Sequence, residues 1–255
     1  MLSRLSLLVA VHVLFACAAW AQCPTGTTAI LSDRDNTLIE DAAGALSNGA
    51  GLYFFTGRTG QGSDDIRRGL ILFDVAGALS PGLTITQASL RLILDQPRDN
   101  GAHPVSLHVV QADWGEGGSQ GAMGEGGGAA ADTGDATWLN SFFGTTTWTS
   151  AGGDFVAGAS ATTTVNSGVN GIYSWASEDM VDDVQSWLDT PLGNFGWLVL
   201  SNEASPNTAM RFTTHENTGN EPVLCVKTCG GATPCTIFSD GFESGNTSQW
   251  SSTSP

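Results

Sequence analysis

A glycine-rich acidic stretch, residues 113–135, holds the side chains best suited to bind a cation. It contains nine glycines, and its four candidate ligands are Asp113, Glu116, Asp132 and Asp135. Calcium takes about six to eight oxygen ligands, which carboxylates and the carbonyls of a pliable glycine backbone can supply. We therefore predict a structural Ca²⁺ site here. The alternative is that these acids are solvated on a loop, because their spacing matches no EF-hand. A second group of candidate acids is Asp33, Asp35, Glu40 and Asp41.

Aromatic and basic residues near the same stretch could bind a sugar. Sugar rings stack on exposed aromatic faces, while polar groups around the rim fix their orientation. The aromatic candidates are Trp114, Trp138 and Trp148. Arg58 and Arg211 could pair with the carboxylate of a uronate. The alternative for each tryptophan is burial in the core, which we expect for Trp175, Trp187 and Trp197.

Catalytic motifs are absent from the sequence. It has no Gly-x-Ser-x-Gly elbow, no His-Glu-x-x-His helix and no phosphate-binding glycine loop. We interpret His103, His108 and His215 as surface or hydrogen-bonded residues, with His108 on the polar side of its strand. A glycosidase needs only two carboxylates at a suitable spacing, so a hydrolase is the third-ranked alternative. We predict that the chain is not an enzyme.

The charge of the chain limits its partners. The 255 residues carry 9 basic and 25 acidic side chains, a net charge of −16. Nucleic acids and anionic lipids bind basic surfaces, so we expect neither as a partner. A neutral polysaccharide fits this charge better than a polyuronate, which would need a bridging cation. Nothing in the sequence indicates the oligomeric state.

The two ends of the chain differ in character from its middle. Residues 1–21 resemble a signal peptide, with Arg4, an apolar run and the small-x-small triplet Ala19-Trp20-Ala21. We predict a secreted or cell-surface protein with one domain at 22–228 and a Gly/Ser-rich tail at 229–255. After cleavage, no segment is long enough to span a membrane. The four remaining cysteines predict disulfides with three alternative pairings, and they are Cys23, Cys225, Cys229 and Cys235.

Alternating apolar residues predict a β-sheet, and this sheet would position the candidate binding residues. The runs RRGLILFDV and ITQASLRLIL, at residues 67–75 and 85–94, read as neighbouring strands. The unbroken apolar run at 194–202 predicts a central strand. Residues 177–188 predict one short helix that begins after Ser177 and is ended by Pro191. We count about ten strands, and the predicted fold is all-β: an antiparallel jelly-roll β-sandwich with one short helix.

The order of these segments resembles the DNRLRE-domain family, secreted bacterial modules classed with carbohydrate-binding modules. The matching pieces span residues 30–227 and include RRGLILFDV, EDMVDDVQSWLD and NFGWLVLSNE. The hexapeptide that names the family does not occur intact, and its nearest echo is RFTTHEN at 211–217. The resemblance implies a jelly-roll domain without catalytic activity and with polysaccharide as its ligand. The alternative function is a structural or adhesive surface or matrix protein that has the same fold and no sugar site.

Overall fold

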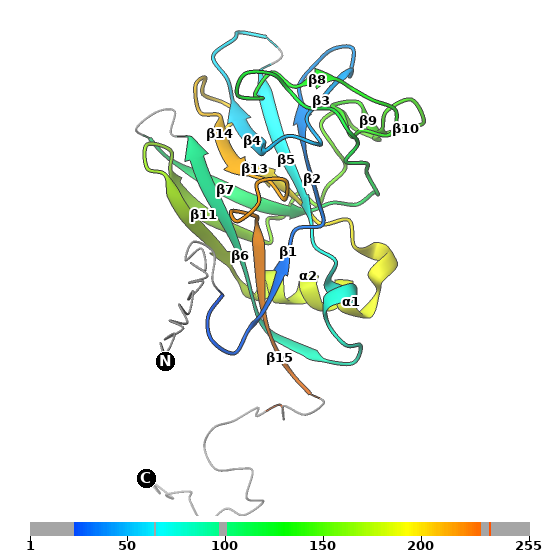
Figure 1. Ribbon diagram of the computed structural model, residues 1–255, viewed down its shortest axis with the longest axis vertical. Coiled ribbons are helices and arrows are strands. Elements are labelled where there is room, and N and C mark those ends of the chain that lie inside the picture. The colour runs from blue at the N-terminus through cyan, green and yellow to red at the C-terminus, as the bar shows by residue number, and fades with distance from the viewer. Residues whose placement is uncertain (1–22, 64, 97–100, 231–234, 236–255) are drawn as a thin grey trace, which may run out of the picture.

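The protein is built from antiparallel β-strands with two α-helices, and it is described here from a computed structural model (Figure 1). The structure describes residues 23–63, 65–96, 101–230 and 235. The predicted signal peptide and most of the predicted tail lie outside these residues. Eleven strands form one sheet in which all pairings are antiparallel, and two further pairs of short strands stand apart from it. The all-β prediction is therefore confirmed.

The sheet has two halves joined by β4 and β5. One half contains β1 (Thr28–Leu31), β15 (Val223–Cys229), β6 (Thr84–Gln96), β12 (Gly171–Ala176), β14 (Met210–Thr213) and β4 (Tyr53–Arg58). The other contains β2 (Arg34–Ile39), β5 (Ile66–Leu72), β13 (Trp197–Leu200), β7 (Ala102–Val109) and β11 (Ala161–Asn166). The short pairs are β3 (Leu46–Ser47) with β8 (Ala129–Ala130), and β9 (Asn140–Phe142) with β10 (Thr146–Thr147).

The two halves curl around a shared core. Leu90, Leu92 and Phe212 from the first half pack in one buried cluster with Ile71 and Trp197 from the second. Along β6, the residues that enter this core alternate with half-buried and exposed ones, as predicted for a strand with one buried face. Apolar and polar residues therefore alternate along β6 because one face of the strand packs on the core and the other faces solvent.

The middle strands of the second half of the sheet, β5 and β13, are buried on both faces. Ile71 and Val199 face the shared core, while Leu70 and Leu198 face a second cluster on the opposite side. The glycine-rich stretch and the residues after it cover that side, and they contribute Trp114 and Trp148. A strand buried on both faces needs apolar residues at successive positions, which explains the unbroken apolar runs. The prediction that the strand at 194–202 is central is confirmed, because β13 lies between β5 and β7.

The prediction that the runs RRGLILFDV and ITQASLRLIL form neighbouring strands is wrong. They form β5 and β6, but β14 and β4 lie between them in the sheet. The connection between β5 and β6 contains the short helix α1 (Val75–Ala78), which lies beside the second helix (Figure 1). A connection of this length lets the chain pass from one half of the sheet to the other, whereas a tight turn would pair the two strands.

The predicted helix is confirmed as α2 (Glu178–Asp189). The Ser177 hydroxyl accepts a hydrogen bond from the Met180 N–H at 3.0 Å and caps the helix. Met180, Val184, Trp187 and Leu188 are buried in the shared core, whereas Val181 is only partly buried. A 3₁₀ turn, η1 (Pro191–Gly193), follows directly, as Pro191 predicts.

Two disulfides lie at the ends of the described chain, and the first of them joins one end to the other. Cys23, before β1, pairs with Cys225 in β15, and Cys229 pairs with Cys235. This selects one of the three pairings that the sequence allowed. The first disulfide adds a covalent link between segments that already pair as β1 and β15. Disulfides are typical of proteins in oxidising compartments.

Candidate functional site

Four polar residues from distant segments meet at one end of the sheet. Asp35 lies on β2, with its side chain on the face opposite Asn36 and Leu38. Glu116 comes from the glycine-rich stretch, and His215 and Glu216 form the turn that follows β14. We call this group the Asp35–His215 cluster. Among the residues that the structure describes, Asp35, His215 and Glu216 form the one group of three potential metal ligands, with donor atoms within 4.8 Å of one another.

The imidazole of His215 lies at the centre of the cluster. Its Nδ1 is 3.3 Å from Asp35 Oδ2 and 3.3 Å from Glu116 Oε1. Its Nε2 is 3.4 Å from Glu216 Oε1. Two backbone hydrogen bonds hold the acids in place: Asp35 Oδ2 accepts from the His215 N–H at 2.9 Å, and Glu116 Oε1 accepts from the Asp35 N–H at 2.8 Å. The geometry of the cluster is therefore set by the backbone as well as by the side chains.

The charges of the cluster are not balanced. Burial raises the pKa of Asp35 and of Glu216, and it raises the pKa of Glu116 to about 7. The hydrogen bond with Asp35 raises the pKa of His215 to about 9, and the nearby carboxylates act in the same direction. Three carboxyl groups thus share one imidazolium. Asp35 is fully buried, and its Oδ1 has no hydrogen-bond partner.

The structure does not bring the four predicted calcium ligands together. Asp113 is exposed and pairs with Arg34 at 3.2 Å, while Glu116 faces His215. Asp135 is buried and accepts a hydrogen bond from the backbone N–H of Asp132 at 2.7 Å. Glu116 and Asp135 are held by different backbone groups and face different neighbours, and the described group of potential metal ligands does not include Asp113, Asp132 or Asp135.

The second group of acids also divides. Only Asp35 joins the cluster. Glu40 accepts hydrogen bonds from the backbone of Asp65 and Ile66, both at 2.9 Å, and Asp41 accepts from the Ala45 N–H at 2.8 Å. These two acids satisfy backbone donors at the end of β2. The Asp35–His215 cluster therefore draws one acid from each predicted group and adds His215 and Glu216, which the sequence did not single out for metal binding.

Two of the three tryptophans predicted to stack on sugars are buried. Trp114 is 0% exposed and donates its indole N–H to the Phe195 carbonyl at 2.8 Å. Trp148 is 5% exposed and donates to the Thr137 carbonyl at 2.9 Å. Both rings are buried because they pack against the apolar outer face of β5 and β13. Neither ring offers a face to a sugar, so the prediction is wrong for these two residues.

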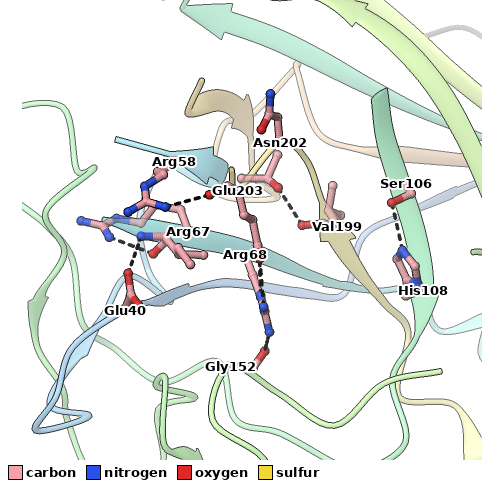
Figure 2. A network of polar contacts seen from close by, with 12 residues as sticks. Glu40, Arg58, Arg67, Arg68, Ser106, His108, Gly152, Val199, Asn202 and Glu203 are labelled. Carbon is pink, nitrogen blue, oxygen red and sulfur yellow. Dashed lines mark hydrogen bonds and ion pairs between the residues drawn. The ribbon is translucent and has the colours of Figure 1, made fainter. Parts of the chain in front are cut away.

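Arg58 belongs to a polar network over the same sheet (Figure 2), and the third tryptophan, Trp138, packs against Arg68 of that network. Arg68 lies over the Trp138 ring at 4.9 Å from its centroid, and its guanidinium donates two hydrogen bonds to Glu203, at 2.8 and 3.0 Å. Arg58 donates to Asp65 at 2.8 Å and to the Glu203 carbonyl at 3.1 Å. Arg58 is thus occupied by partners within the protein, and this disfavours the predicted contact with a uronate.

Arg211, one of the five predicted sugar-binding residues, lines a surface pocket. The pocket has a volume of about 380 Å³ and lies over the outer side of β4 and β14, under the glycine-rich stretch. Arg211 stacks on Tyr53, 3.8 Å from the ring centroid, and pairs with Asp95. Phe55 contributes part of the floor. The amide side chains on the lining are Gln61, Gln96 and Asn207.

His108 and His215 are hydrogen-bonded, as predicted. His108 lies on the face of β7 opposite the core residues Val105 and Leu107, with Nδ1 at 3.0 Å from the Val156 carbonyl and Nε2 at 2.9 Å from the Ser106 hydroxyl, but this side chain is buried. Residues 155–156 cover that side of β7, which the strand pattern alone does not reveal. His215 is half-buried in the cluster. The one feature of the sequence that drew attention to His215 is its place beside Glu216 in RFTTHEN, the segment nearest to the family hexapeptide.

Comparison with known proteins adds no relative: no protein-family model matches the chain, and no curated protein is significantly similar to it. In the described part of the chain, no helix has the length and apolar character needed to cross a bilayer.

Proposed function

We propose that this chain is a secreted, non-catalytic carbohydrate-binding domain of the jelly-roll type, with its sugar site in the pocket beside Arg211. The observation that carries this proposal is the composition of the pocket. Of the residues that line it, one is basic, three are amides and none is acidic, in a chain with a net charge of −16. The acidic surface of the protein therefore does not extend into the pocket.

The lining suits the hydroxyl groups of a neutral sugar. Each amide side chain both donates and accepts hydrogen bonds, as a hydroxyl group does. The Phe55 ring supplies an apolar floor, and the Gly124, Gly126 and Gly127 backbone groups can approach a ligand closely because no side chain intervenes. Arg211 is already paired with Asp95, and this favours a neutral polysaccharide over a uronate. The resemblance to the DNRLRE-domain family supports a polysaccharide ligand but leans toward acidic glycans, so the preference for a neutral one rests on the pocket and the charge.

The alternative is a structural or adhesive protein of the surface or matrix. Burial of Trp114 and Trp148 and the internal pairing of Arg58 favour this alternative, because they remove three of the predicted sugar contacts. The two functions differ in whether the pocket binds a ligand at all.

The pocket offers a matched pair of variants for this test. A Cβ added at Gly127 would meet no atom within 4 Å, so Gly127→Trp can block the pocket without disturbing its walls. Gly193→Trp is the control, because Gly193 is exposed in η1 and its Cβ would meet only Thr190 at 3.9 Å. Electrophoresis in gels loaded with neutral polysaccharides or polyuronates measures binding, with release of reducing ends measured in parallel.

We expect retardation of the wild type by at least one neutral polysaccharide, loss of about tenfold or more in affinity in Gly127→Trp, and no change in Gly193→Trp. Retardation by uronates alone would contradict the neutral class. Equal retardation of both variants would remove the pocket as the site. No retardation in any gel would favour the structural alternative, and released reducing ends would favour a hydrolase.

A further inference from the structure

We propose that Asp35, His215 and Glu216, with Glu116 beside the same imidazole, form a binding site for one divalent transition-metal ion of the Zn²⁺ class. This site is separate from the pocket beside Arg211, and the proposal does not depend on sugar binding. It rests on the spacing of the donor atoms, an unpartnered buried carboxylate oxygen, the types of ligand and the charge of the cluster.

The spacing of the donor atoms is that of a small coordination sphere. Ligands at about 2.1 Å from a tetrahedral Zn²⁺ ion lie about 3.4 Å from one another. His215 Nδ1 is 3.3 Å from Asp35 Oδ2 and from Glu116 Oε1, and His215 Nε2 is 3.4 Å from Glu216 Oε1. His215 Nδ1, Asp35 Oδ2 and Glu116 Oε1 can therefore reach one ion. Glu216 lies beside the other ring nitrogen, but its donor atom is within 4.8 Å of those of Asp35 and His215, so it would join the same ion after a movement of its side chain.

Asp35 supplies an observation independent of this clustering. Its side chain is fully buried, and Oδ1 has no hydrogen-bond partner, while Oδ2 accepts from the His215 backbone. Glu216 Oε2 is likewise buried without a partner. A buried polar atom without a partner costs free energy unless a ligand satisfies it. A cation bound by both oxygens of the Asp35 and Glu216 carboxylates would give these two atoms a partner.

The donor types select the class of ion. Calcium and magnesium prefer sites made of oxygen alone, whereas imidazole nitrogen together with carboxylate oxygen suits zinc and its neighbours in the first transition row. The histidine therefore argues against the calcium that the acids alone suggest. Three carboxyl groups around one imidazole also leave excess negative charge, which a divalent ion would neutralise.

The surrounding hydrogen bonds orient the ligands. The Asp35 N–H donates to Glu116, and the His215 N–H donates to Asp35, so two of the three acids are each held by the backbone of another cluster residue. Such outer contacts are typical of metal sites, where they fix the direction of the ligand lone pairs. A bound ion would tie β2, the glycine-rich stretch and the turn after β14 together and so act structurally.

The test uses the full chain after treatment with EDTA and dialysis. Isothermal titration with Zn²⁺ and Ca²⁺ measures binding, visible absorption after addition of Co²⁺ reports the geometry, and thermal unfolding reports stability. We expect one Zn²⁺ per chain, a visible Co²⁺ spectrum and a Tm that rises by about 5–10 °C when zinc is a hundredfold above its Kd. Ca²⁺ should produce a much smaller rise.

The variants separate ligands from neighbours. Asp35→Asn and His215→Gln should weaken Zn²⁺ binding by more than tenfold, and the more peripheral Glu216→Gln should also weaken it. Asp113→Asn is the matched control, because Asp113 lies near Glu116 in sequence but is exposed and pairs with Arg34; it should bind zinc as the wild type does. Circular dichroism checks that each variant is folded.

Three results would overturn the proposal: folded wild type that binds no stoichiometric Zn²⁺ or Co²⁺, calcium binding as tight as zinc binding, or equal zinc affinity in wild type and Asp35→Asn. If His215→Gln fails to fold, the wild-type Co²⁺ spectrum and the Glu216→Gln titration still decide, since an imidazole–carboxylate site gives a spectrum that is lost with its ligands.

Discussion

The carboxylate of Asp35 accepts a hydrogen bond from the backbone N–H of His215, 180 residues further along the chain, at 2.9 Å. This contact joins β2 to the turn after β14, and Asp35 is fully buried where it does so. One side chain thus links the two halves of the sheet at the end where the Asp35–His215 cluster forms. The stability of the fold and the proposed metal site share this contact.

Asp35→Ala should lower the free energy of unfolding by about 1–3 kcal/mol in the presence of EDTA, because the His215 N–H loses its buried acceptor. Asp35→Asn should cost less, since its side-chain oxygen can still accept that hydrogen bond and no buried charge remains. Urea denaturation followed by fluorescence measures both. Equal losses in the two variants would show that the hydrogen bond contributes little.

Trp114→Ala should lower the free energy of unfolding by about 3–5 kcal/mol, the usual cost of removing a large buried aromatic side chain. Trp114 covers the outer face of β5 and β13 with Leu70 and Leu198. Trp138→Ala should cost less because this ring is only partly buried. The comparison is made by urea denaturation at constant pH. A loss below that of Trp138→Ala would contradict the role of Trp114 as a cover.

The two disulfides should differ in their contributions. The Cys23–Cys225 bond closes a separation of 202 residues and the Cys229–Cys235 bond one of 6. Chain entropy then predicts stabilisation of roughly 5 kcal/mol for the first and roughly 2 kcal/mol for the second. Paired Cys→Ser variants compared by thermal unfolding test this order. A lower Tm for the variant without the Cys229–Cys235 bond than for the variant without the Cys23–Cys225 bond would contradict the predicted order.

Asp183 should make stability depend on pH. It is half-buried on α2 and accepts a hydrogen bond from the Trp197 indole at 2.8 Å. Burial raises its pKa above the ordinary 3.8, so the folded state holds this proton more tightly than the unfolded state does. The stabilising contribution is present below about 3.8 and is lost as pH rises through the folded pKa.

Asp183→Asn removes this dependence while keeping an acceptor for Trp197. The stability of the variant relative to wild type should therefore increase as pH rises from about 3 into the range above 3.8. Asp182→Asn, which removes the same charge at an exposed neighbouring position, corrects for net charge. Parallel curves for Asp183→Asn and Asp182→Asn across this range would count against the prediction.

Several strands could be predicted from their residues because their burial is local in origin. The alternation along β6 indicates one buried face, and Ser177 with Pro191 marks the ends of α2. The candidate sites were harder to predict. Glu116 was predicted to bind a cation together with Asp113, Asp132 and Asp135, but it faces His215. Trp114 was predicted to lie on a sugar-binding surface, but its side chain is buried. The pattern of one segment cannot show what another segment covers.

The sequence by itself determined the all-β class, the central place of β13, the capped helix and the use of cysteines as disulfides, because these follow from periodicity, propensity and composition over a few residues. Only the tertiary structure decided which strands pair, which tryptophans are covered and which acids meet. Asp35 and Glu116 are 81 residues apart, and Asp35 and His215 are 180 apart. These long-range contacts depend on how the sheet curves. Many residues together determine that curvature, so the sequence around any one residue does not indicate its distant partner.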